Sequence, residues 1–243
     1  MTRLVTVSWG SDQFRFGPWH ADQDVAYVAV SPRVVNPTSG GVRLLVERLT
    51  QQGYSGAVTA ALRPEEAAAF TAAGFAERER LVVLSHDLTG LPGAADAMPA
   101  DVSPRTALRR ARRSDRAAVL EVDSLAFESV WQLDEHGLAE AIDATPHTRF
   151  RVIQDGSIVG YAICGRSGRT GYIQRLAVDP TRQHGGLGRW LVIDALSWLR
   201  RRGSTMAMVN TQQSNLRALD LYRRLGFHTE PTPLTVLTRD LER

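Results

Sequence analysis

The segment "QRLAVDPTRQHGGLGRWLVIDALSWLRRRG", Gln174–Gly203, joins an apolar strand to an amphipathic helix through a loop that holds three glycines. We expect the helix over 187–202, because apolar residues recur on one face from Leu187 to Trp198 and a glycine follows its end. The N-terminus of a helix carries unpaired amides and a partial positive charge. Glycine lets the backbone come close to a ligand, so this strand-to-helix loop is typical of an anion site, most often for phosphate.

Two familiar phosphate-binding loops do not fit this segment. A P-loop needs a Gly-Lys-Ser/Thr sequence, and the chain contains no lysine. A dinucleotide fingerprint needs the order G-x-G-x-x-G, whereas the order here is Gln183-x-x-Gly186-x-Gly188.

Composition narrows the class of protein. The chain has 243 residues, of which 43% are hydrophobic and 23% charged, as in an ordinary globular protein. It has no apolar run long enough for a membrane span and no signal-peptide layout, so we expect a cytoplasmic location without membrane contact. The formal charge of +3 is small and the arginine clusters lack interleaved aromatics, so we expect no nucleic-acid partner. The single cysteine, Cys164, lies in an apolar run and is expected to be buried rather than nucleophilic.

A segment rich in proline, glycine and alanine, residues 89–103, divides the chain and is predicted to be a linker. After it, hydrophobic periodicity predicts strands over 106–111, 148–154, 157–165, 171–178, 205–210 and 234–241, the last of which closes the sheet. Helices are predicted from an N-cap at Ser114 through Phe127, over 135–143, over 187–202, and over 214–225 before Gly226. Asp155-Gly156 signals a hairpin turn. This order predicts a mixed α/β fold, a central mixed sheet flanked by helices.

The loop and its surroundings resemble the GNAT acyltransferase superfamily. The order Q-x-x-G-x-G resembles the acyl-CoA loop of that family, "LAVDP" resembles the strand before it, and "NLRALDLYRRLGF" resembles its second signature. The resemblance covers residues 104–243. Within the family, the ribosomal-protein N-terminal acetyltransferases are most similar, because "AFESVW" sits where they carry an aromatic loop between the first two helices.

The resemblance implies acetyl-CoA as cofactor and an amine as acceptor substrate, with no metal. It implies a catalytic acid at Tyr222, which would protonate the leaving thiolate; the alternative is a core aromatic. Backbone groups of the strand would pair with the pantetheine arm, and loop amides would hold the pyrophosphate, with Arg182 and Arg189 within reach of phosphate oxygens. The cofactor-binding residues implied in this way are Leu176, Ala177, Val178, Gln183, His184, Gly185, Gly186, Leu187, Gly188, Arg189 and Asn215.

The general base does not follow the family pattern. Many relatives place a glutamate on the strand before the glycine loop or on the next strand, where this chain has Tyr172, Gln174, Arg175 and Asn210. Glu128 is the nearest carboxylate by topology, although it is also compatible with a solvated surface residue. A chain of water molecules is a further possibility, so the base stays unassigned.

The N-terminal part repeats the order strand, helix, strand, helix-Gly-Phe, strand that follows residue 170. The repeat favours a duplication, and chance similarity between two α/β segments is the alternative. The copy keeps Gly40 and Gly41 but has Phe70 at the position of Tyr222 and Pro64 near that of Asn215. We therefore predict a degenerate GNAT-like half domain over 1–88 without cofactor, a linker over 89–103, and a catalytic domain over 104–243.

Two hypotheses of function follow. The first is an acetyl-CoA-dependent N-acetyltransferase in which an amine attacks the thioester directly. The second is a CoA-binding sensor or assembly protein that has lost catalysis. The sequence leaves open whether the acceptor is a small molecule or a protein N-terminus, which acyl chain is preferred, and whether the chain is a monomer or a homodimer.

Overall fold

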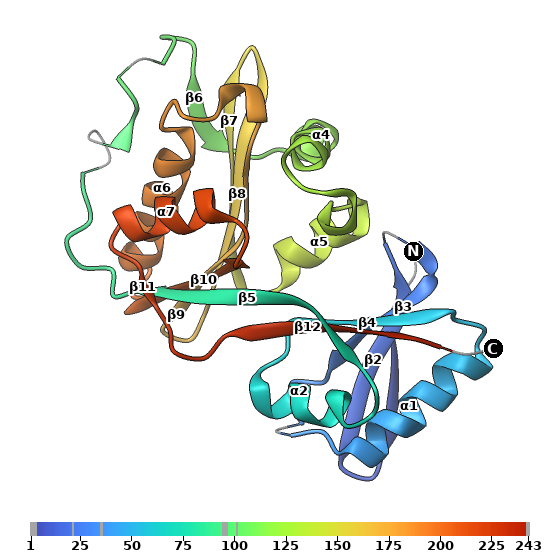
Figure 1. Ribbon diagram of the computed structural model, residues 1–243. Coiled ribbons are helices and arrows are strands. Elements are labelled where there is room, and N and C mark those ends of the chain that lie inside the picture. The colour runs from blue at the N-terminus through green and yellow to red at the C-terminus, as the bar shows by residue number, and fades with distance from the viewer. Residues whose placement is uncertain (1–3, 21, 35, 94–96, 101, 242–243) are drawn as a thin grey trace. The chain divides into compact units, whose positions relative to one another are not determined.

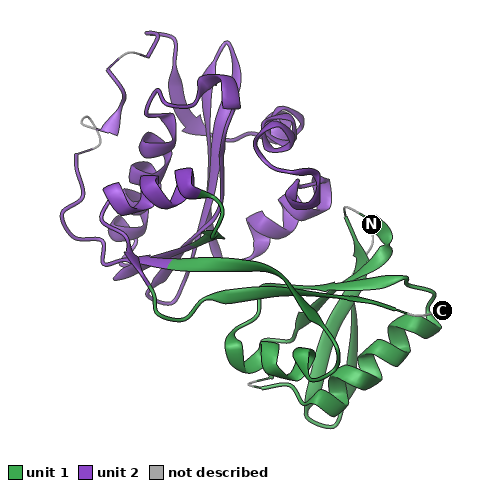
Figure 2. Cartoon of the chain, in the orientation of Figure 1, with its two compact units in different colours: residues 1–83, 210–215, 230–243 green, residues 84–209, 216–229 purple. Residues whose placement is uncertain are grey.

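A computed structural model describes residues 4–20, 22–34, 36–93, 97–100 and 102–241 (Figure 1). Part of the predicted linker 89–103 lies outside the described residues. The chain divides into two compact units, here called unit 1 and unit 2 (Figure 2). Unit 1 comprises residues 1–83, 210–215 and 230–243, and unit 2 comprises residues 84–209 and 216–229. The predicted mixed α/β class is confirmed.

The strands of unit 1 lie side by side in the order β1-β2-β3-β4-β12-β5. β3 and β4 run parallel, and the other neighbouring pairs are antiparallel. The strands are β1 (Val5–Trp9), β2 (Asp12–Trp19), β3 (Asp22–Val30), β4 (Gly56–Thr59), β12 (Leu234–Asp240) and β5 (Ala76–His86).

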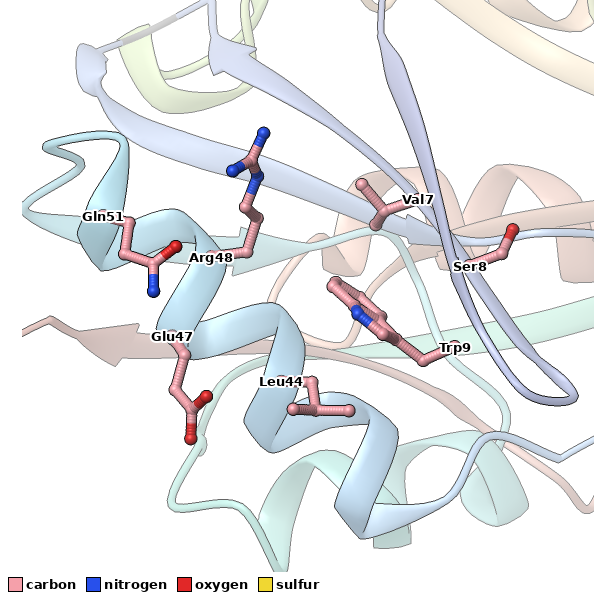
Figure 3. A pocket seen from close by; sticks show the side chains of 7 residues that line it. All are labelled: Val7, Ser8, Trp9, Leu44, Glu47, Arg48 and Gln51. Carbon is pink, nitrogen blue, oxygen red and sulfur yellow. The ribbon is translucent and has the colours of Figure 1, made fainter.

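Two helices complete unit 1, α1 (Ser39–Gln51) and α2 (Pro64–Thr71). The core between strands and helices is aromatic and aliphatic; Phe14 contacts Phe70 edge to face, with ring centroids 6.0 Å apart. An open groove of about 400 Å³ lies between β1 and α1, with Trp9 and Leu44 facing each other across it (Figure 3). None of the site residues predicted from the sequence lines this groove.

Unit 2 contains an antiparallel meander, β6 (Ala107–Arg110), β7 (His147–Asp155), β8 (Ser157–Ser167) and β9 (Thr170–Val178), followed by β10 (Met206–Gln212), which runs parallel to β9. The hairpin between β7 and β8 turns at Gly156, with φ +75°, as predicted. At the other end of the unit, β11 (His228–Thr229) pairs with the end of β5.

Helices cover both faces of this meander. α4 (Arg116–Ala126) and α5 (Glu135–Asp143) lie on one face, and α6 (Leu187–Arg201) and α7 (Leu216–Arg224) lie on the other (Figure 1). β8 contributes to the cores on both faces: Tyr161 and Ile163 belong to the core with α4 and α5, and Val159 and Ala162 to the core with α6. Within the described parts of the chain, no helix combines the length and the apolar character needed to cross a membrane.

The predicted N-cap at Ser114 is wrong. Residues Arg113–Asp115 form a turn of 3₁₀-helix, and α4 begins only at Arg116. The Asp115 carboxylate accepts the Arg112 amide at 2.6 Å and a bidentate ion pair from Arg109. The Asp115 carboxylate therefore holds the 3₁₀ turn that precedes α4, and no side chain among the described residues caps α4 itself.

The last strand lies apart from the unit in which the sequence places it. β12 was expected to close the sheet of residues 104–243, but it lies between β4 and β5 in unit 1. The buried Thr59 hydroxyl also accepts the Leu237 amide at 2.9 Å. The segment 104–243 therefore contributes to both compact units.

The end of α7 is held by a buried histidine. The His86 Nδ1 atom accepts the Leu88 amide at 2.8 Å, so the proton sits on Nε2, which donates to the Leu225 carbonyl at 3.0 Å. Desolvation lowers the pKa of His86 below its ordinary value, with a smaller effect of His228 in the same direction. The Asp87 carboxylate, 3.8 Å from Nδ1, and the bond to Leu225 act in the opposite direction.

A truncated chain of residues 103–243 is expected to unfold at a lower temperature than the full chain. Its β12 loses both neighbouring strands and the bond from Leu237 to Thr59, so a row of backbone groups is left without partners. Calorimetry of both chains measures the difference. An unchanged melting temperature contradicts this prediction.

The free energy of unfolding is expected to fall as the pH drops below about 6.5, the ordinary pKa of histidine. The folded state binds a proton at His86 less readily than the unfolded state, so this contribution is complete above that pH and is lost on acidification. Urea titrations between about pH 5 and 8 on the wild type and His86→Asn measure it, since asparagine keeps one donor and one acceptor. Equal pH slopes for the two proteins contradict the assignment.

Candidate active site

The glycine loop turns directly from β9 into α6. The Asp179 carboxylate accepts the Thr181 amide at 2.8 Å and starts a 3₁₀ turn, Pro180–Arg182. His184 and Gly186 follow with left-handed φ of 69° and 77°. The Gly186 carbonyl accepts the first bond of α6, from the Trp190 amide at 3.0 Å. The amides at the start of the 15-residue helix have no acceptor within the helix and converge at its end.

The three glycines of the loop differ in what a side chain would meet at each position. At Gly186 the left-handed backbone disfavours a side chain, and a Cβ would lie 3.2 Å from the Pro99 ring. At Gly188 a Cβ would lie 3.3 Å from the Leu221 side chain, so a small residue lets α6 pack beside α7. At Gly185 a Cβ would meet only a backbone oxygen at 3.9 Å. Of the three glycines, Gly185 is therefore the one at which a side chain fits without a clash within the protein.

Gln183 ties the loop to the end of β9. Its Nε2 donates to the Val178 carbonyl at 2.9 Å, and its Oε1 is buried without a partner among the described residues. His184 lies exposed beside it, in the backbone conformation that glycine favours. The sequence identified these two residues by position, and the structure brings both to the start of α6.

The outer edge of β9 is open where the strand approaches the loop. β10 pairs with β9 only over Met206–Met208 and Thr170–Tyr172, whereas β9 continues to Val178. The Asp179 amide donates to Val159 on β8, so the alternation of an antiparallel ladder turns the backbone of Ala177 toward β8. The backbone groups of Leu176 and Val178 face the opposite edge. Of the three residues implied by the resemblance, these two are placed to pair with an extended ligand.

Tyr222 lies on α7, one residue from the Leu221 side chain that packs beside Gly188. Its ring is buried against Phe227, with centroids 5.2 Å apart. Burial raises the pKa of its phenol above the ordinary value, which keeps the proton on oxygen.

The predicted residues do not all share one place. Glu128 is exposed at the start of a 3₁₀ turn, Ser129–Trp131, between α4 and α5. Asn215, directly before α7, donates its amide to the Gln212 carbonyl at 3.0 Å and belongs to unit 1. Arg182 pairs with Asp155, and Arg189 donates to the Ala97 carbonyl at 3.4 Å. Glu128 has no contact with Tyr222 among the interactions of the described residues.

Cys164 is buried in β8, as predicted. Burial raises the pKa of its thiol to about 12, so a thiolate nucleophile is excluded at neutral pH.

Sequence reasoning missed two contributors to this region. Ala97 and Pro99 were taken as linker, but Ala97 is 2% exposed and both contact the start of α6. Asp123 is wholly buried and pairs with Arg175 on β9. A signal for Asp123 was present, since a carboxylate lies among the apolar residues Val119, Val122 and Ala126 of one helix.

Comparison with known proteins places this geometry in a family. Residues 116–227 match the acetyltransferase (GNAT) family. A mycothiol acetyltransferase of Amycolatopsis mediterranei is 28% identical over 177 residues, 65% of this chain and 57% of the relative. One of Streptomyces coelicolor is 32% identical over 165 residues, 64% of this chain and 52% of the relative. The chain thus spans little more than half the length of these relatives.

Solved structures share the fold. A tandem GNAT protein from the clavulanic acid biosynthesis pathway has a TM-score of 0.65 at 13% identity, over 96% of this chain and 79% of that chain. A GCN5-related N-acetyltransferase from Kribbella flavida has a TM-score of 0.62 at 15% identity, over 99% and 91%. The glycine loop, the open edge of β9 and Tyr222 all lie within residues 116–227, the segment that matches the family. Residues 116–227 of this chain are therefore a domain of the GNAT acetyltransferase family.

Proposed function

We propose that this chain transfers an acetyl group from acetyl-CoA, the acyl donor of GNAT acetyltransferases, to an amine. The observation that carries the proposal is the start of α6, where left-handed residues aim helix amides at one point beside the open edge of β9. Helix amides and dipole suit the pyrophosphate without a lysine. The exposed backbone of Leu176 and Val178 suits the amide-containing pantetheine arm, which pairs like an added strand.

The chemistry is a direct attack. The neutral amine nitrogen bonds to the thioester carbonyl carbon, and the carbon–sulfur bond breaks. Tyr222 donates its proton to the leaving thiolate, and the proton lost by the amine passes to solvent, with or without Glu128. Burial raises the pKa of this phenol, so the proton stays on its oxygen until the thiolate forms.

We propose a small-molecule amine as the acceptor class. Support comes from the names of the relatives, which are mycothiol acetyltransferases. The acceptor of those enzymes is the first to test, beside glucosamine, cysteamine and the peptide Ala-Ala-Ala. Turnover of the peptide alone would favour the protein N-terminus that the sequence left open.

We propose further that unit 1 is a degenerate copy that binds no cofactor. It repeats the order β3, α1, β4, α2, β5, with β3 and β4 parallel like β9 and β10. At the start of α1 the protein supplies its own anion: buried Asp12 accepts the Thr38 amide at 3.0 Å and the Thr38 hydroxyl at 2.5 Å. A Cβ on Gly41 would overlap the Asp12 carboxylate. In unit 1 the Asp12 carboxylate therefore occupies the start of α1, the place that corresponds to the proposed phosphate site at the start of α6.

Calorimetry is expected to give one acetyl-CoA site per chain, and Gly185→Asp is expected to weaken it about tenfold relative to Gly185→Asn. The two side chains have the same shape, and only the aspartate repels phosphate; like charges a few ångströms apart near a protein surface cost on the order of 1–4 kcal/mol. Gly186 is unsuitable for this test because any side chain there strains the backbone. Equal affinities of the two variants would show that the phosphate does not bind at this loop. Two sites per chain would refute the proposal that unit 1 binds no cofactor.

Tyr222→Phe is expected to lower kcat by about 10²–10⁴-fold while the acetyl-CoA dissociation constant stays within about twofold. The loss of a hydroxyl removes the proton donor but leaves the ring against Phe227. Steady-state kinetics with the best amine of the panel and calorimetry measure both values, and Tyr54→Phe in unit 1 is the control. Wild-type kcat in Tyr222→Phe would leave Tyr222 as a packing residue only.

A further inference from the structure

A fully buried carboxylate lies in the middle of α4. Asp123 has 0% exposure, and both its oxygens are occupied. The Tyr161 hydroxyl of β8 donates to Oδ2, and the Leu133 amide donates to Oδ1 at 2.7 Å. Burial raises the pKa of the Tyr161 phenol, so this donor keeps its proton.

Arg175 of β9 neutralises this carboxylate. Its Nε and Nη2 atoms lie 2.8 Å from the two Asp123 oxygens, a bidentate pair. Nη2 also donates to the Trp131 carbonyl at 2.6 Å, and the guanidinium carbon lies 3.5 Å from the centre of the Phe127 ring. One side chain therefore joins β9 to α4 and to the segment that follows α4.

These contacts fix one loop, residues 127–133, at three points. The Phe127 ring stacks on the Arg175 guanidinium, and the Trp131 carbonyl accepts a hydrogen bond from it. The Leu133 amide donates to the Asp123 carboxylate. A buried ion pair is weak support for stability, because desolvation offsets much of its attraction. Its directional hydrogen bonds nevertheless restrict the loop to one conformation. If a partner moved away, a buried polar group would lose its hydrogen bond.

The anchor adjoins the proposed donor site. Arg175 immediately precedes Leu176, whose backbone faces the open edge of β9. The β8–β9 register shifts between Ile163 and Cys164, so that Ile163 lies opposite Arg175 and Cys164 opposite Ile173. Gln174 is thus an extra residue in β9, a bulge that redirects side chains next to it. The same short segment of β9 serves the cofactor with its backbone and holds loop 127–133 with a side chain.

We propose that Arg175, with Asp123 and Tyr161, is a positioning residue that holds loop 127–133 as a wall of the amine-acceptor site. The role in catalysis rests on the proposed acetyl transfer, whereas the anchoring of the loop does not. Arg175 acts through the loop and not on the reacting atoms. Its loss therefore raises the KM for the amine and leaves acetyl-CoA binding intact.

The test uses the paired variant Asp123→Asn/Arg175→Gln, which removes both charges and leaves no buried charge unpaired. The matched control is Asp115→Asn/Arg109→Gln, which removes another bidentate pair of unit 2. The other hydrogen-bond partners of that pair, Gln154, Arg110 and Arg112, lie outside loop 127–133. Arg175→Lys keeps the charge but not the two-pronged geometry. Hydrogen exchange of the amides of residues 127–133 is measured in the full-length protein, with and without acetyl-CoA.

The paired variant is expected to exchange the Leu133 amide at least about tenfold faster than the wild type and the control, and Arg175→Lys lies between them. With the panel amine that gives the highest wild-type rate, its KM rises about tenfold while the acetyl-CoA dissociation constant stays within about twofold. Unchanged exchange in the loop overturns the anchor. Faster exchange with an unchanged amine KM overturns the acceptor wall. Absence of acetyl transfer in the wild type refutes the proposed function instead, and the exchange result still decides the anchor.

Discussion

The change of direction between β9 and α6 is the constraint from which the candidate site follows. Two residues with left-handed φ, His184 and Gly186, turn the chain so that the helix starts beside the strand edge it has just left. Leu187 is then buried at once, which fixes the helix axis against the sheet. The amides at the helix start gather next to the backbone of Leu176 and Val178, without any charged side chain in a required place. A site built from backbone depends on geometry more than on side-chain chemistry.

The start of the helix that follows a strand differs between the two compact units. Both compact units place a helix after a strand that has a parallel neighbour. In unit 1 the carboxylate of Asp12 takes the helix start, bonded to Thr38, and Gly41 has no side chain that would displace it. In unit 2 the corresponding loop holds the exposed residues His184, Gly185 and Gly186, and the helix has no side-chain cap among the described residues. In unit 1 the Thr38 hydroxyl accepts the Gly41 amide of the helix and donates to Asp12, so the helix start is satisfied from within the protein.

Polar side chains hold irregular parts of the chain in unit 2. Asp123 and Arg175 fix loop 127–133, His86 holds the last turn of α7, and Gln183 holds the glycine loop to β9. Each ties a loop or a helix end to a strand by directional bonds, which apolar packing alone does not provide. Loop 127–133 is thereby held against β9, although the two segments are far apart in sequence.

The sequence by itself determined most helices and strands between residues 104 and 229 and the loop between β9 and α6, because glycine spacing and hydrophobic periodicity are local properties of the chain. It also indicated the buried state of Cys164. Only the tertiary structure decided that β12 pairs with β4 and β5, since alternation shows which face of a strand is buried but not which strand lies beside it. The partner of Asp123 was hidden for the same reason: Arg175 lies on a distant strand, and only folding brings the two charges within 2.8 Å. The 3₁₀ turn at the position predicted for the Ser114 cap was hidden as well, because its Asp115 carboxylate binds Arg109, a contact that no local pattern contains.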